Sequence, residues 1–194
     1  MNALITGFFR NFAATKHVMT QLEQQIRDDL RHYLSSRGEL DERMPECPDV
    51  EEKWESLAKS YLPDGIREYA RYPMASLGWM MYLGMAVAKM WDENWQAYAY
   101  QPDLYAYVRD KRGFDSMDEY VREEVLQLSG AAFDELEQMV GECAARLDNR
   151  LRRLHVEPGT KAAFEAYVAC LHQLYLMGVA VQLHRMGYHM EQVE

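Results

Sequence analysis

Apolar residues recur every three or four positions along most of this chain, which is the spacing of one face of an α-helix. No run alternates with a period of two for long, and no Asn-Gly hairpin signal occurs. The first amphipathic helix carries Val18, Leu22, Ile26, Leu30 and Tyr33. Thr15 or Thr20 can cap its start, and Thr20 has the spacing of a capping box with Glu23. Gly38 suits a left-handed residue after its end. The pattern predicts an all-α protein, an irregular bundle of about six to eight helices.

Capping residues and prolines predict where the later helices begin and end. Pro63 is expected to end one helix, because proline removes a backbone donor and crowds the preceding turn. Asp103 and Thr160 are expected to cap the starts of two others. Ser116 with Glu119 has the spacing of a second capping box, at the start of a helix that reaches Leu128.

Two of the predicted helices, at about 73–99 and 160–187, are much more apolar than the others. Each has an apolar stripe along one side, and each stripe has a glycine near its middle, Gly84 in the first and Gly178 in the second. A glycine inside a helix costs about 1 kcal/mol relative to alanine. Close approach of two backbones is the usual compensation. We therefore expect these helices to be central and to meet at Gly84 and Gly178.

The same two helices raise the question of a membrane span, which needs roughly 20 apolar residues. Residues 73–88 are uncharged, but Lys89, Asp92 and Glu93 follow at once. Residues 166–184 contain no Asp, Glu, Lys or Arg, but polar His172 and Gln182 lie inside the stretch. The sequence therefore predicts a soluble protein without a membrane partner.

Length, charge and cysteine content indicate the number of domains, the kinds of partner and the cellular compartment. A chain of 194 residues without a long linker predicts one domain over 1–194. Residues 1–14 are apolar, and we expect them to be an arm for packing or dimerisation. The net charge of −10 argues against a nucleic-acid partner. Three cysteines without a CxxC pair suit reduced thiols in the cytoplasm. Cys47, between two prolines, is expected to be the most accessible of them.

Most of the candidate binding residues lie where the first apolar helix gains charged residues and is expected to leave the core. Beyond Lys89 it carries a dense group of Trp and Tyr, and such side chains are common both at protein interfaces and at the mouths of pockets. The rim of a packed core would look the same. Two histidines in the second apolar helix complete the set. The candidates are Trp91, Asp92, Trp95, Tyr98, Tyr100, Tyr105, His172 and His184.

Motifs for catalysis, metals and cofactors are missing from the sequence. There is no HExxH, Walker loop, GxGxxG or GxSxG. His172 and His184 are twelve residues apart, about 120° around one helix, so that helix alone does not direct both to one ion. We expect no metal and no cofactor.

These observations favour a binding or assembly protein without a catalytic site. We expect it to self-associate as a homodimer, or to bind another protein, through the Trp/Tyr region or the N-terminal arm. The alternative is a helical enzyme or small-molecule carrier. Its pocket would lie between the two apolar helices, with His172, Asp92 and His184 as polar groups.

Overall fold

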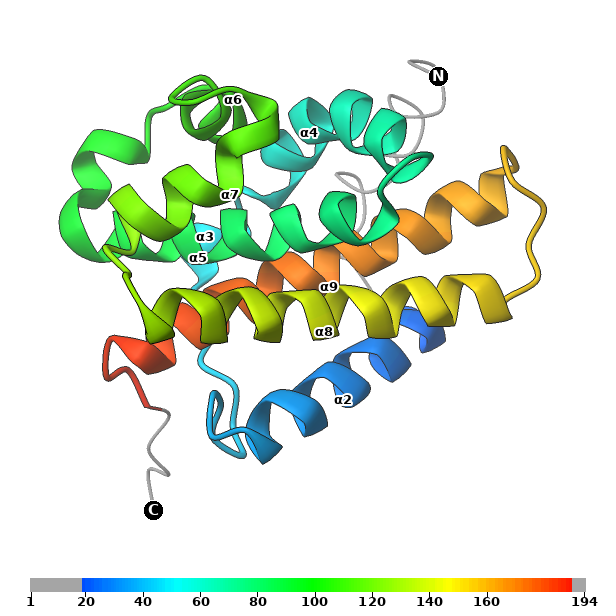
Figure 1. Cartoon of the computed structure of the whole chain (residues 1–194), viewed down its shortest axis with the longest axis horizontal. Helices are drawn as coiled ribbons and strands as arrows, with labels where there is room; N and C mark the ends of the chain where they lie inside the picture. The colour runs from blue at the N-terminus through cyan, green and yellow to red at the C-terminus, as the bar shows by residue number, and fades with distance from the viewer. Residues whose placement is uncertain (1–18, 190–194) are drawn as a thin grey trace.

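The computed structural model describes residues 19–189, and within that range the chain forms helices and no strand (Figure 1). The prediction of an all-α protein is therefore confirmed. The arm at 1–14 lies outside the described residues. The helices are α2 (Gln21–Ser36), α3 (Pro48–Glu51), α4 (Trp54–Tyr69), α5 (Pro73–Tyr98), α6 (Leu104–Arg109), α7 (Met117–Tyr120), α8 (Ala131–Arg153) and α9 (Lys161–Arg185), with a 3-10 turn at Phe114–Ser116 and a π-helical turn at Val121–Val125.

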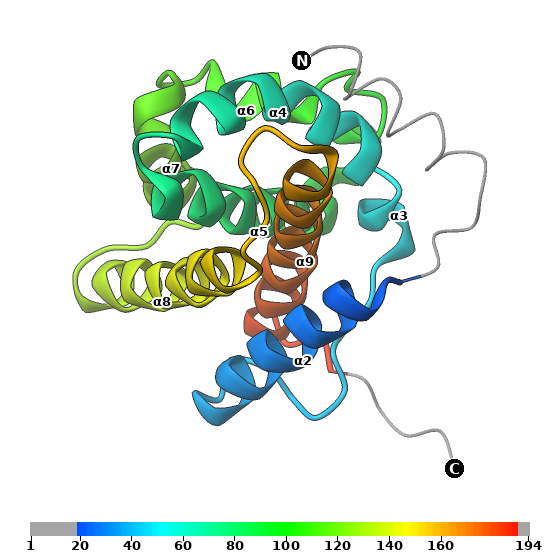
Figure 2. The same ribbon diagram turned by 90° about the vertical axis from the view of Figure 1, so that its right-hand side faces the viewer.

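The two apolar helices, α5 and α9, form the centre of the molecule and run in the same direction. Near their starts, the hydroxyls of Ser76 and Tyr167 are 2.6 Å apart. Just beyond the end of α9, the Tyr188 hydroxyl donates to Asp92 of α5, 2.7 Å away. Most positions of both helices are buried on every side. Helices α2, α4 and α8 lie around this pair (Figure 2).

The backbones of α5 and α9 touch where the two glycines lie. A Cβ built on Gly84 would come closer than 3.0 Å to the carbonyl oxygen of Tyr175, and it would lie 3.1 Å from the amide nitrogen of Val179. A Cβ on Gly178 would meet the carbonyl oxygen of Met81 in the same way. Neither site has room for any side chain. The prediction that the helices meet at Gly84 and Gly178 is confirmed.

Most of the predicted helix ends are also confirmed. Thr20 accepts from the amide of Glu23 at 3.2 Å, and Glu23 accepts from the amide of Thr20 at 2.8 Å, which is a complete capping box. Gly38 has a φ of 74°. Asp103 and Thr160 cap α6 and α9 through their side chains. These ends are set by contacts within a few residues, so the local sequence is sufficient to predict them.

Two predicted ends are wrong. Pro63 lies inside α4, which continues to Tyr69. Proline costs a helix about 3 kcal/mol, but its neighbours Tyr61 and Leu62 are fully buried, and burial of two large side chains offsets that cost. Ser116 occupies the N-cap position of α7 as predicted, although its side chain makes no cap hydrogen bond, and it is the predicted end at Leu128 that is wrong. There the chain passes from α7 into a π-helical turn that ends at Val125, three residues before the predicted end.

Among the described residues, only α9 is long and apolar enough to cross a membrane by length and composition. In its most apolar window, 94% of the positions are buried inside the protein. A helix that is covered by its own protein on nearly all sides fits the core of a soluble protein.

Candidate functional site

The predicted site residues do not converge on one place. Trp91 and Asp92 lie on the last part of α5, beside the segment that follows α9. The rings of Trp91 and Tyr188 are 5.7 Å apart, edge to face, and Asp92 accepts the hydrogen bond from the Tyr188 hydroxyl. These contacts hold the segment after α9 against α5, and the carboxylate of Asp92 is engaged in one of them.

Trp95 and Tyr98 lie beyond an irregularity in α5. Asn94 leaves the helical conformation, with φ −164° and ψ 72°, so the last turn points in a new direction. The Lys53 ammonium lies 5.5 Å from the centre of the Trp95 ring and donates to the carbonyl of Ala99. This cation–π contact and hydrogen bond hold the last turn of α5 close to α4.

A second aromatic pair lies on the same turn and extends to α6. The rings of Tyr98 and Tyr107 are 5.7 Å apart, edge to face, and the Lys111 ammonium lies 4.5 Å from the centre of the Tyr107 ring. Tyr100 follows directly, and 89% of it is exposed. We call Trp95, Tyr98, Tyr100 and Tyr107 the aromatic surface. Trp95, Tyr98 and Tyr107 are half-buried against the core. Tyr100 is the member whose ring is exposed to solvent.

Tyr105 does not belong to this surface, which corrects its prediction as a binding residue. It is fully buried, with its ring edge to face against Tyr61 at 5.3 Å. Its hydroxyl donates to Asp64 at 2.7 Å. Residues two positions apart in an α-helix lie about 200° apart around its axis, so Tyr105 and Tyr107 point to nearly opposite sides of α6. The sequence shows Tyr105 and Tyr107 as one cluster, but only Tyr107 faces outward.

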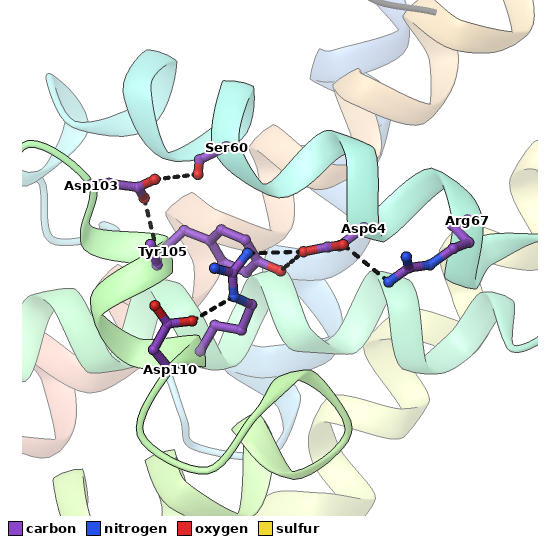
Figure 3. A network of polar contacts seen from close by, with 8 residues as sticks. Ser60, Asp64, Arg67, Asp103, Tyr105 and Asp110 are labelled. Carbon is purple, nitrogen blue, oxygen red and sulfur yellow. Dashed lines mark hydrogen bonds and ion pairs between the residues drawn. The ribbon is translucent and has the colours of Figure 1, made fainter.

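Asp64 is the centre of a polar network between α4 and α6 (Figure 3). One of its oxygens accepts from Tyr105 and, at 3.2 Å, from Arg109, and the other accepts from Arg67 at 3.0 Å. Nearby, Asp103 accepts from the hydroxyl of Ser60. Burial, and then the hydrogen bond to Asp64, raise the pKa of the Tyr105 phenol, which therefore keeps its proton. A carboxylate with three donors is suited to hold two helices together and poorly suited to act as a general base.

His172 lies where α2, α4 and α9 meet. Its ring stacks on Trp54, with centroids 4.6 Å apart and an interplanar angle of 21°. Its Nδ1 is 3.4 Å from the carboxylate of Glu23, and only 12% of its side chain is exposed. Glu23 is itself buried and belongs to the capping box of α2. His172 is therefore a core histidine with partners, well placed to join α2 to α9.

His184 lies near the end of α9 and has different neighbours. Its Nε2 is 3.4 Å from one oxygen of Asp41, and the Nδ1 of His189 is 2.6 Å from the other. The two imidazole rings are 5.0 Å apart. Sequence reasoning missed Asp41 and His189. Gly187 between the two histidines was the available signal, because a glycine after a helix often turns the chain back over its last residues.

The cysteines offer no reactive thiol. All three are buried, including Cys47, so the expectation that Cys47 would be accessible is wrong. It comes directly before α3 and belongs to the buried hydrophobic core. Burial raises the pKa of Cys143 and of Cys170 to about 12, so both are thiols rather than thiolates at neutral pH.

Three arginines near the end of α8 have partners within the protein. Arg146 pairs with Asp29 at 3.2 Å, and Arg152 pairs with Asp148 at 2.8 Å. Arg150 donates to the side chain of Gln25. Asp29 and Asp148 neutralise two of these three positive charges, whereas the uncharged amide of Gln25 leaves the charge of Arg150 in place.

The described residues thus contain an aromatic surface, a structural network around Asp64, a core histidine and a small Asp–His–His cluster. Comparison with models of known protein families, with curated proteins and with solved structures finds no match for this chain.

Proposed function

We propose that this protein is a cytoplasmic binding or assembly protein without a catalytic role, and that it self-associates as a homodimer through the aromatic surface. The observation that carries the proposal is the exposure of Tyr100 beside three half-buried aromatic side chains. Tyr and Trp dominate the energetic centres of protein interfaces, because they bury much area and lose little side-chain entropy.

The fixed geometry of the aromatic surface supports the proposal. Trp95 is held by Lys53, and Tyr98 is held by Tyr107. Side chains that are already ordered pay less entropy on binding, so a partner gains more of the contact energy. The lysines beside the rings offer charged groups for the rim of such an interface.

The rival function is an enzyme or carrier with a pocket between α5 and α9. Among the described residues, no observation supports such a pocket. The backbones of the two helices touch at Gly84 and Gly178, which leaves no room for a ligand at their crossing. The three polar groups expected to serve that pocket each have another partner within the protein, since Asp92 accepts from Tyr188, His184 faces Asp41 and His172 stacks on Trp54.

The test is the mass of the protein in solution, measured by sedimentation equilibrium over a wide range of concentration. Tyr100→Ser removes the exposed ring of the aromatic surface. Tyr72→Ser is the matched control, because Tyr72 is also a strongly exposed tyrosine, at 64%, and it lies before the start of α5. Neither ring is part of the core, so both variants are expected to fold.

We expect the wild type to dimerise and the Tyr100→Ser variant to dimerise at least about tenfold more weakly, which corresponds to about 1.4 kcal/mol. The Tyr72→Ser variant should match the wild type. A wild type that is monomeric at every concentration would refute self-association. Equal weakening by both substitutions, or by Tyr72→Ser alone, would refute the choice of surface.

A further inference from the structure

Asp41, His184 and His189 come from separate parts of the chain and meet at one end of the molecule. Asp41 lies in the loop after α2, His184 in the last turn of α9, and His189 in the segment that follows. The loop after α2 and the end of α9 lie at the same end in both views (Figures 1 and 2). One ligand atom from each residue can be chosen so that all three atoms lie within 4.8 Å of one another.

One of the separations in this cluster already matches that between two ligands of a transition-metal ion. With bonds of roughly 2.0–2.2 Å, two donors of a tetrahedral zinc site lie about 3.3–3.6 Å apart. The Nε2 of His184 and the nearer oxygen of Asp41 are already 3.4 Å apart. The Nδ1 of His189 and the other oxygen are 2.6 Å apart, which is a hydrogen bond. A metal ion would replace that hydrogen bond after a small rotation of the side chains.

The backbone after α9 places His189 without help from an ion. Gly187, with φ 88°, turns the chain, the amide of Gly187 donates to the carbonyl of His184, and the amide of Tyr188 donates to the carbonyl of Leu183. This pair of hydrogen bonds is the Schellman motif that ends many helices. The turn returns the chain toward α9, and the Tyr188 hydroxyl then anchors it on Asp92.

The loop that carries Asp41 is also fixed by other contacts. Both oxygens of Glu39 accept from the guanidinium of Arg185, each at 2.8 Å. A two-bond pair of this kind sets orientation as well as distance. It also neutralises the charge of Arg185, the residue next to His184. The hydroxyl of Ser35 adds a long hydrogen bond, 3.5 Å, to the carbonyl of Asp41.

From these contacts we propose that Asp41, His184 and His189 bind a divalent transition-metal ion of the zinc type. Two imidazole nitrogens and one carboxylate would hold it, and water would fill the remaining position. Imidazole with carboxylate is a ligand set that zinc accepts readily. The bound ion would link the segment after α9 to the loop after α2. This site is independent of the aromatic surface.

The test uses the full chain, stripped of metal with a chelator and then dialysed. Zn²⁺ is titrated by calorimetry, and Co²⁺ is titrated by its visible absorption, which reports the ligand geometry directly. Single variants His184→Gln, His189→Gln and Asp41→Asn remove one ligand each. His32→Gln is the matched control, because His32 is an exposed histidine on α2. Circular dichroism verifies that each variant is folded.

We expect one equivalent of Zn²⁺ to bind the wild type and the control, and each of the three ligand variants to bind at least about tenfold more weakly. Zn²⁺ should also raise the thermal midpoint of the wild type and not that of the His184→Gln variant. Absence of saturable binding would overturn the proposal. Binding that is unchanged in both His184→Gln and His189→Gln would overturn it as well, since the ion would then lie elsewhere.

Discussion

Substitution of Gly84 by alanine tests the close crossing of α5 and α9 most directly. The new methyl group would overlap the carbonyl oxygen of Tyr175 and crowd the amide of Val179. Both of these atoms belong to the backbone of α9, so no side chain can rotate away to make space. The two helices must separate, and the side chains packed around the crossing must then rearrange.

The magnitude follows from two opposing effects. Overpacking of a core costs typically 1–3 kcal/mol, and a clash with backbone atoms at the centre of the fold places Gly84→Ala at about 3 kcal/mol. Alanine favours the helix over glycine by about 1 kcal/mol. The net expectation is a loss of about 2 kcal/mol in the free energy of unfolding. For a protein of this size, that is a large share of the total stability.

The assay is urea unfolding, followed by circular dichroism. Gly141→Ala is the matched control, because Gly141 also lies inside a helix, α8, and a Cβ there would meet nothing within 4 Å. The helix preference then acts alone, and the control should gain up to about 1 kcal/mol. The two glycine-to-alanine changes should therefore have opposite signs. If Gly84→Ala were as stable as Gly141→Ala, the backbones would not be in contact at the crossing.

A double substitution sharpens the same test. Once Gly84→Ala has separated the helices, Gly178→Ala should cost less than it does alone, because the two methyl groups share one displacement. Residues in contact show such coupling energies, of about 0.5–3 kcal/mol. Simple addition of the two losses would contradict a single shared crossing.

Three further predictions concern tyrosines and cysteines. Burial, and then Asp148, raise the pKa of Tyr69 to about 12, while an unfolded tyrosine titrates near 10, so the folded state keeps a proton that the unfolded state releases. The free energy of unfolding should be unaffected by Tyr69 below pH 10 and should fall as the pH rises toward 12. An absorbance titration would contradict this if every tyrosine ionised near pH 10 while circular dichroism showed that the protein was still folded. Cys143 and Cys170 should resist alkylation in the native protein and react in urea, as mass spectrometry will show; rapid native labelling would mean that they are not buried thiols. Tyr105→Phe should lower the free energy of unfolding by about 1–2 kcal/mol, because Asp64 loses a buried donor, whereas Tyr100→Phe should change nothing, and equal stability of the two variants would show that the hydrogen bond contributes little.

The centre of the fold could be predicted because its signals are strong and repeated. Two long apolar helices leave few other ways to bury their surface, and a glycine at the middle of each stripe needs a reason. The capping box at Thr20 and Glu23 was predictable for a different reason, since both partners lie within one turn.

The candidate sites were less predictable because they depend on contacts between distant segments. Asp41 and His184 are 143 positions apart, and nothing in the sequence around either residue indicates the other. The burial of Tyr105 depends on which side of the short helix α6 faces α4. Pro63 shows the same limit, since local preference predicted a helix end and the packing of its neighbours overrode it.

The parallel course of α5 and α9 also affects how the chain reaches its folded state. Gly84 and Gly178 are separated by 94 positions, so their contact closes a long loop and forms slowly compared with local helices. During synthesis α5 leaves the ribosome well before α9, and its apolar surface lacks its main partner until α9 has emerged. The same glycine crossing that brings two backbones into contact in the finished protein therefore makes the nascent chain dependent on the arrival of α9.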